Sequence, residues 1–241
     1  MTSQHTTLMD GRVQLTQSMN GLRASTDSVL LSSIVQTQQG QSVLDMGCGT
    51  GSVGLCVNER LKGLELHLTG IDIQDQMIGL AKGNAVENGI NGRSHYIVGD
   101  VADKTVFEAE AFDHIVMNPP YYDEGTRQKS PDAAREKAYT GDLKVWIASS
   151  LHWLRQGGSI NMINRADALS DILSYMDGKF GAIEVWPVYS KPNEPAIRVL
   201  VRGLRNRKTP MTIHPSIILF DDDGAPSAQS QSILRDGAGL V

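Results

Sequence analysis

Cysteine, aromatic residues and long apolar runs are all scarce in this chain of 241 residues. The two cysteines, Cys48 and Cys56, have the spacing of neither a disulfide framework nor a zinc site, so we expect reduced thiols, no metal and a cytoplasmic location. No apolar run approaches the roughly 18 residues of a membrane span, and the N-terminus lacks a signal-peptide pattern. We therefore expect no membrane contact.

Positive charge is also in short supply, because the formal net charge is −5. This balance excludes a molecule that binds nucleic acid over its whole surface, and leaves only a local patch. One stretch near the C-terminus is basic, and its candidate RNA-binding residues are Arg198, Arg202, Arg205, Arg207 and Lys208. A solvated hairpin rim and a phosphate-binding surface both fit this stretch.

Strand-like and helix-like patterns alternate from residue 41 onwards, which favours a parallel sheet covered on both faces. The expected strands span 41–46, 65–73, 95–99, 111–117, 159–163, 181–189 and 196–204, and the expected helices span about 26–38, 52–61, 74–88, 142–155 and 166–177. The joint at 191–195 is too short for a crossover helix, so the last two strands should form an antiparallel hairpin. The prediction is an α/β fold with a seven-stranded, mostly parallel sheet.

We expect residues 1–241 to form a single domain, and the sequence favours a monomer without fixing the oligomeric state. Residues 1–40 are an N-terminal cap segment and helix, 41–204 the core, and 205–241 a C-terminal extension. The first 20 residues are polar and are expected to be loose, apart from a short strand near Arg12 to Leu15.

The chain is organised around a glycine loop between the first core strand and the next helix. The loop carries Gly47, Gly49 and Gly51, with Cys48 among them, and Asp45 stands just before it. Glycines allow a ligand to approach the backbone, and the helix that follows offers unpaired N–H groups. The Asp45 carboxylate would repel a pyrophosphate and attract a cation, so S-adenosylmethionine suits the loop better than NAD. A glycine loop that holds no ligand is the alternative.

Two further acids end the next strands. Asp72 follows Gly51 at the distance from which a carboxylate can bind both ribose hydroxyls, with Ile73 beside it. Asp100 could accept a hydrogen bond from the cofactor's adenine amine, with Val101 beside the ring. Taken singly, such acids are more often solvated strand ends.

A second motif, Asn118-Pro119-Pro120-Tyr121, follows a buried strand. In open α/β sheets, ligands bind at the carboxyl ends of strands. The Asn118 side-chain oxygen and the Pro119 carbonyl can accept hydrogen bonds from an NH2 group, while the prolines stiffen the backbone and Tyr121 offers a face for a planar group. These residues are our catalytic candidates, Asn118 is also a candidate cofactor-binding residue, and a rigid turn is the alternative.

Together, Asp45-x-Gly47-x-Gly49-x-Gly51, Asp72, Asp100 and Asn118-Pro119-Pro120-Tyr121 resemble the class I S-adenosylmethionine-dependent amino-methyltransferases. The stretches 21–31, 130–135 and 198–215 are more closely similar to bacterial methyltransferases of adenine N6 in valine tRNA. The resemblance implies a Rossmann-like fold, S-adenosylmethionine as cofactor, and a tRNA substrate methylated beside the anticodon.

Other substrates remain open at this point: a glutamine side chain in a protein, or a base in ribosomal RNA or DNA. A catalytically idle RNA-binding module is the alternative outside the enzyme class. The polar stretch 122–140 begins at the expected reaction site and is therefore predicted to be a substrate-contacting loop.

Overall fold

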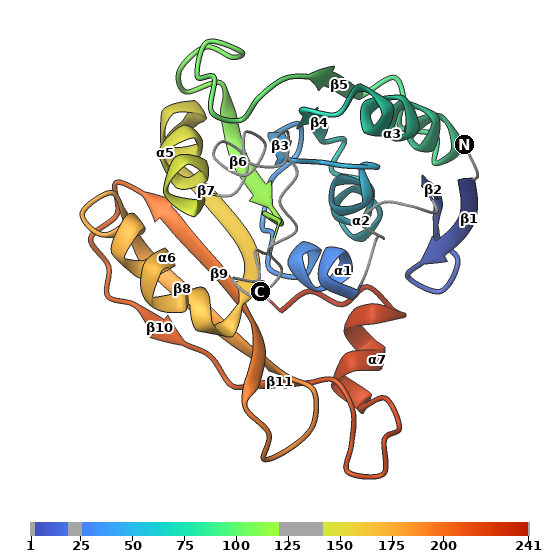
Figure 1. Ribbon diagram of the computed structural model, residues 1–241, viewed down its shortest axis with the longest axis vertical. Helices are drawn as coiled ribbons and strands as arrows, with labels where there is room; N and C mark the ends of the chain where they lie inside the picture. The colour runs from blue at the N-terminus through green and yellow to red at the C-terminus, as the bar shows by residue number, and fades with distance from the viewer. Residues whose placement is uncertain (1–2, 19–25, 121–141, 241) are drawn as a thin grey trace, which may run out of the picture.

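The computed structural model describes residues 3–18, 26–120 and 142–240 (Figure 1). The strands are β1 Ser3–Leu8, β2 Val13–Ser18, β3 Ser42–Met46, β4 His67–Asp72, β5 Ser94–Val98, β6 Phe112–Met117, β7 Leu154–Arg165, β8 Phe180–Tyr189, β9 Ala196–Arg205, β10 Thr212–Ile213 and β11 Ile217–Ile218. The helices are α1 Thr26–Ser32, α2 Ser52–Arg60, α3 Asp75–Glu87, α5 Leu143–Trp153, the short 3-10 helix η1 Ala166–Ala168, α6 Leu169–Met176 and α7 Ala228–Leu234.

The central sheet has the strand order β5-β4-β3-β6-β7-β9-β8-β10, with β11 also paired to β8. Only β9 runs antiparallel to its neighbours, so the expected mostly parallel sheet and C-terminal hairpin are confirmed. The expected number of seven strands is wrong, because β10 and β11 extend the sheet to nine. Each of these added strands has two residues, which is too short to produce a periodic sequence pattern.

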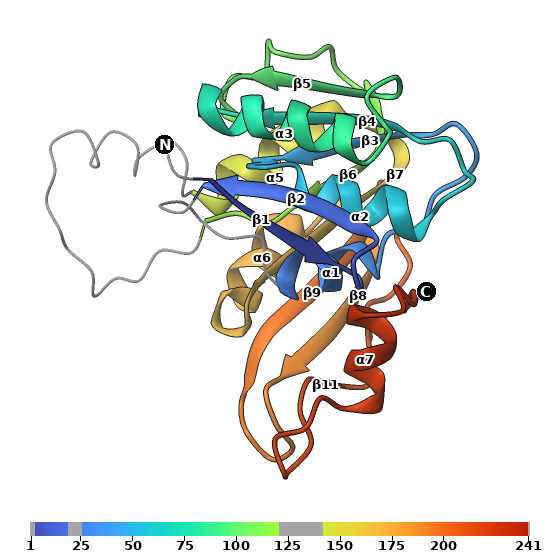
Figure 2. The same cartoon turned by 90° about the vertical axis from the view of Figure 1, so that its right-hand side faces the viewer.

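Helices cover both faces of the sheet, as expected (Figures 1 and 2). One hydrophobic core lies under α1 and α2 and includes Val43, and the other includes Leu44 and residues of α5 and α6. Adjacent residues of β3 point into different cores, so both faces of this strand are buried. Its sequence is therefore apolar at nearly every position. The strands β3, β4, β5 and β6 run parallel to one another, so their carboxyl ends lie at the same edge of the sheet.

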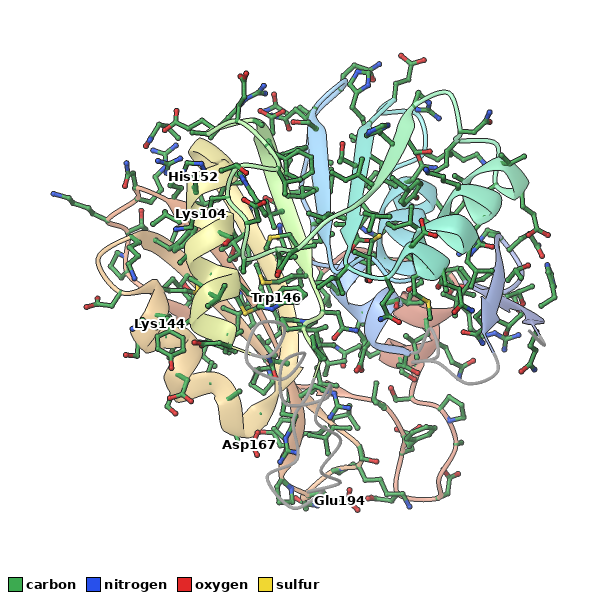
Figure 3. The ribbon with its side chains drawn as sticks, turned by 45° about the horizontal axis from the view of Figure 1, so that its top comes forward. Lys104, Lys144, Trp146, His152, Asp167 and Glu194 are labelled. Atoms are coloured by element: carbon green, nitrogen blue, oxygen red, sulfur yellow. The ribbon has the colours of Figure 1, made fainter. Side chains whose placement is uncertain are left out.

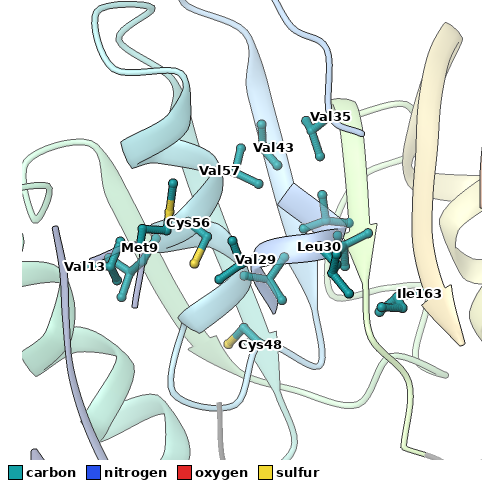
Figure 4. Packing of buried hydrophobic residues seen from close by; sticks show 14 of the residues in the cluster. Met9, Val13, Val29, Leu30, Val35, Val43, Cys48, Cys56, Val57 and Ile163 are labelled. Atoms are coloured by element: carbon teal, nitrogen blue, oxygen red, sulfur yellow. The ribbon is translucent and has the colours of Figure 1, made fainter. Parts of the chain in front are cut away.

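The expected short strand near Arg12 to Leu15 is present as part of β2, but the prediction that the rest of this segment is loose is wrong for residues 3–18. The strands β1 and β2 form an antiparallel hairpin with Ser3 opposite Ser18 and Leu8 opposite Val13. Met9, Val13 and Leu15 are buried in the same core as Val29 of α1 (Figure 4). Polar residues between these few apolar ones hid the inward-facing pattern.

Two element boundaries also differ from expectation. The helix α1 ends at Ser32 instead of continuing to residue 38. The Ser32 and Ser33 hydroxyls donate to backbone carbonyls in the last turn, and the Arg60 guanidinium donates to the Ser32 carbonyl. These donors occupy carbonyls that further helical turns would need.

The strand β7 begins at Leu154 instead of at the expected residue 159. Gly157 and Gly158 lie inside β7, where its pairing with β6 shifts register between Phe112 and His114. Glycine inside a strand is typical of such an irregularity.

Within the part of the chain that the structure describes, no helix has the length and apolarity of a membrane span. The described residues also bring together no group of three or more side chains that could hold a metal ion. The predicted loop 122–140 lies outside the described residues.

Candidate active site

The glycine loop connects β3 to α2 with three left-handed residues. Gly47, Gly49 and Gly51 have φ angles of 66°, 53° and 81°, which residues with a side chain rarely adopt. A Cβ on Gly47 would lie 2.4 Å from the Trp146 ring, and one on Gly51 would lie 3.1 Å from the Tyr96 hydroxyl. A Cβ on Gly49 would meet nothing within 4 Å. The loop is therefore packed underneath at its two ends and open above its middle glycine.

Asp45 is a buried carboxylate at the end of β3. Its side chain is 1% exposed and accepts a 3.0 Å hydrogen bond from the Gly54 backbone N–H in α2. Burial raises the pKa of Asp45 to about 7, the Gly54 N–H opposes this shift, and the charge of Asp72 adds to it. No ion pair with Asp45 occurs within residues 3–18, 26–120 and 142–240. A nearby cation would stabilise the charged form of this group.

Asp72 and Asp100 stand at the ends of the next two strands, and both organise backbone. Asp72 accepts hydrogen bonds from the N–H groups of Gly49, at 2.8 Å, and Gln74, at 2.9 Å. Asp100 accepts one from the Ala102 N–H at 2.8 Å. A carboxylate has about four acceptor positions, so these bonds leave capacity for ligand hydroxyls and amines.

Three further candidate cofactor residues lie in different surroundings. Ile73 is 42% exposed directly after Asp72, whereas Val101 is buried. The Cys48 side chain points into the core (Figure 4), where burial raises the pKa of its thiol. Only the backbone of Cys48 belongs to the loop surface, and it bonds Ile71 and Gly51. Cys48 therefore shapes the loop through its main chain.

The reaction motif begins directly after β6, next to the glycine loop. Met46 pairs with Met117, so the residues that follow on the two neighbouring strands are Gly47 and Asn118. Asn118 is half-buried, Pro119 is buried and Pro120 is half-buried. Tyr121 lies outside the described residues. The sheet topology thus brings the first part of the motif beside the loop, although the two are about 70 residues apart in the chain.

Sequence reasoning missed several residues that support this site. The ring of Trp146, which Figure 3 labels on α5, lies against Gly47. The Ser28 and Ser52 hydroxyls are 2.9 Å apart and join α1 to the first turn of α2, directly after the loop. No periodic or motif signal in the sequence marks such contacts.

The basic stretch is divided between two edges of the sheet. Arg198 lies opposite Arg165, the last residue of β7, and therefore near the edge that carries the reaction motif. Arg205 lies opposite Phe180, the first residue of β8, at the other edge, and the exposed Arg207 and Lys208 follow it. In Figure 3, the labelled residues Asp167 and Glu194 lie at the edge near Arg198, and Lys104 and His152 lie at the opposite edge. The five predicted RNA-binding residues do not form one surface.

Three of these arginines form ion pairs. Arg198 lies 3.2 Å from Asp27, Arg202 lies 2.6 Å from Glu184 and Arg205 lies 3.0 Å from Glu110. Their side chains are 28%, 12% and 15% exposed, so Arg202 and Arg205 have little surface left for a phosphate.

Residues 23–190 match the family model described as "Methyltransferase small domain". A protein of Glaesserella parasuis named tRNA1(Val) (adenine(37)-N6)-methyltransferase is 27% identical over 206 residues, covering 84% of each chain. A protein of the same name from Actinobacillus pleuropneumoniae is 24% identical over 204 residues, with the same coverage.

Among solved structures, a predicted O-methyltransferase from Agrobacterium tumefaciens has a TM-score of 0.74 at 22% identity. The match covers 89% of this chain and 98% of that one. At this identity the likeness concerns the fold alone, and it confirms the expected Rossmann-like class I methyltransferase architecture.

Proposed function

Because the chain belongs to the methyltransferase small domain family, we propose that it methylates the exocyclic N6 amine of an adenine in tRNA, next to the anticodon. The expected enzyme class is confirmed by the family match over residues 23–190. Two relatives named for adenine 37 of valine tRNA each align with 84% of the chain, and this coverage supports the same substrate here. An enzyme that modifies tRNA would work in the cytoplasm.

S-adenosylmethionine is the cofactor, and when bound it supplies an electrophilic methyl group on a positively charged sulfonium. The residues of the site fit a cationic ligand of this kind. Asp45 is a buried carboxylate whose charge no described cation offsets, and Gly49 leaves open space above the loop. Asp72 would hold the ribose hydroxyls, and Asp100 and Val101 would lie at the adenine.

The observation that carries the proposed reaction is the position of Asn118 at the end of β6, beside Gly47. The Asn118 side-chain oxygen and the Pro119 carbonyl would each accept a hydrogen bond from the target NH2 group. These bonds hold the nitrogen and favour its change from planar to tetrahedral geometry. The amine needs no general base before it attacks, since its proton leaves afterwards, so positioning and electrostatics supply the rate enhancement. Tyr121 would stack on the adenine.

The test is Asn118→Ala with unmodified valine tRNA, measured as single-turnover methyl transfer at saturating cofactor and substrate. Loss of one positioning hydrogen bond should lower the rate by about 10²–10³. Cofactor affinity should change little, because the side chain serves the target amine. Asn91→Ala is the matched control, since Asn91 is an exposed asparagine just before β5, at the opposite edge of the sheet. Its rate should equal that of the unmodified protein.

Product analysis decides the substrate. Digestion of the labelled tRNA should yield N6-methyladenosine, and replacing adenine 37 by guanine should abolish labelling. Label that enters protein instead would favour the glutamine alternative. A folded Asn118→Ala variant with a normal rate would reduce the motif to a rigid turn.

A further inference from the structure

Asn84 on α3 connects the N-terminal hairpin to the glycine loop. Its side chain is 1% exposed. The amide oxygen accepts from the Thr16 N–H at 2.8 Å, and the amide nitrogen donates to the Thr16 carbonyl at 3.0 Å. The same nitrogen donates to the Thr50 carbonyl at 2.9 Å. One buried side chain thus bonds two segments that are 34 residues apart in sequence.

Asn88, one helical turn later, makes the same pair of bonds with the hairpin but has no bond to the loop. It accepts from the Gln14 N–H at 2.9 Å and donates to the Gln14 carbonyl at 2.7 Å. Its amide nitrogen also donates to the Asn84 carbonyl within α3. The two asparagines therefore act on β2 as a neighbouring strand would, and they differ in whether they reach Thr50.

Thr50 is the residue for which such a bond matters most. It stands between Gly49 and Gly51, both with positive φ, where the backbone has more freedom than elsewhere. The Gly49 N–H is fixed by Asp72 and the Gly51 N–H by the Cys48 carbonyl. The bond from Asn84 fixes the peptide carbonyl between them. Without it, the open part of the loop would lose one of three local restraints.

We propose that Asn84 is a positioning residue for the cofactor loop, and that through it the N-terminal hairpin and bound S-adenosylmethionine stabilise one another. The inference rests on the cofactor site of the proposed function. Coupling of this kind is reciprocal: if hairpin docking orders the loop for the cofactor, cofactor binding must strengthen hairpin docking by the same factor. A single buried hydrogen bond corresponds to a factor of about three to ten.

The experiment compares Asn84→Ala with Asn88→Ala in the full chain. Both remove two hydrogen bonds to β2, so both should lower the melting temperature. Calorimetric titration should show cofactor affinity weakened about three- to tenfold in Asn84→Ala alone. Hydrogen exchange of the cofactor-free proteins should be faster at the Gly51 amide in Asn84→Ala alone.

A second exchange measurement tests the reciprocal half of the proposal. Cofactor should slow exchange of the Gln14 amide, whose partner Asn88 is intact, in the unmodified protein and not in Asn84→Ala. If Asn84→Ala fails to fold, the isosteric Asn84→Asp keeps an acceptor for the Thr16 N–H while losing the donor to the Thr16 and Thr50 carbonyls. Equal cofactor affinity and equal Gly51 exchange in folded Asn84 and Asn88 variants would overturn the proposal.

These outcomes also separate the inference from the function on which it rests. An unmodified protein that fails to bind S-adenosylmethionine would overturn the proposed cofactor. The exchange rate at Gly51 would still show whether Asn84 orders the loop.

Discussion

Charged side chains have different kinds of partner in the two halves of the central sheet, one with β3, β4 and β5 and the other with β9. At the ends of β3, β4 and β5, the carboxylates of Asp45, Asp72 and Asp100 accept hydrogen bonds from backbone N–H groups. None of the three forms an ion pair with the residues that the structure describes. On β9, in contrast, Arg198 and Arg202 each lie beside a carboxylate.

The difference decides what each half can bind. A backbone N–H stabilises a carboxylate without cancelling its net charge, so the first half keeps negative charge for a cationic ligand. An ion pair offsets the charge of an arginine, so the largely buried Arg202 and Arg205 offer little attraction for phosphates, and Arg198 keeps more exposed surface. Counting charged residues in the sequence therefore identifies the proposed cofactor half better than the proposed RNA-binding half.

The largest effect should follow from Asp45→Asn, which removes the buried charge. The folded-state pKa of about 7 lies above the unfolded value of 3.8, so the folded protein binds the extra proton between these values. Stability should therefore fall as pH rises from about 4 to about 7 and then level off. At pH 8, Asp45→Asn should stabilise the cofactor-free protein by up to about 4 kcal/mol, measured by urea unfolding. Its cofactor affinity should fall at least about tenfold, because the cation loses its partner.

The same titration should appear in cofactor binding. A cation holds Asp45 in its charged form, so binding below pH 7 should release a proton and weaken about tenfold per pH unit. Asp45→Asn should lack this dependence. Asp113→Asn is the control: burial raises the pKa of Asp113, but hydrogen bonds from Ser42 and Arg155 outweigh burial and lower it. Its removal should destabilise the protein at pH 8 and less so near pH 3; stabilisation by both variants would contradict the distinction.

A smaller effect should separate the two ends of β9 in RNA binding. Arg198 lies near the reaction motif, whereas Arg207 lies beyond the opposite edge. We expect Arg198→Ala to weaken tRNA binding several-fold and to reduce the salt slope by roughly 0.7–0.9. Arg207→Ala should leave both unchanged. Filter binding across a salt series measures both quantities, and a greater loss in Arg207→Ala would move the RNA to the opposite edge.

How much of this could be predicted depends on the range of the interactions involved. The strand β3, the glycine loop and the acid that ends β4 follow from local patterns, since apolar runs, glycines and strand-end acids are adjacent in sequence. The hairpin β8–β9 follows from the short joint between its strands. The confirmed fold class rests on these elements.

The remaining features depend on contacts between distant segments. Trp146 reaches Gly47, Asn84 reaches Thr50, and Glu110 pairs with Arg205, each across many residues. The early end of α1 depends likewise on Arg60. Such pairings leave no periodic signal in one sequence. This is why the sequence predicts only a short strand in a loose N-terminal segment, and why it leaves both a solvated rim and a phosphate-binding surface open for the arginines of β9.

The smallest effect concerns Tyr96 on β5, whose uncharged hydroxyl is buried in the same half of the sheet as the three carboxylates. The side chain is 2% exposed under the glycine loop, and its hydroxyl oxygen has no hydrogen-bond partner within the described chain. In the unfolded protein water bonds this hydroxyl, so burying it opposes folding. Tyr96→Phe keeps the ring that packs against Gly51 and Gly70, and should stabilise the protein by about 1 kcal/mol. Urea unfolding should show a higher midpoint with an unchanged m-value.

Tyr175→Phe, on the partly buried face of α6, is the control and should change stability little. A loss of stability in Tyr96→Phe would mean that the hydroxyl is hydrogen-bonded in solution, and would remove it from the polar groups that this half of the sheet leaves unpaired.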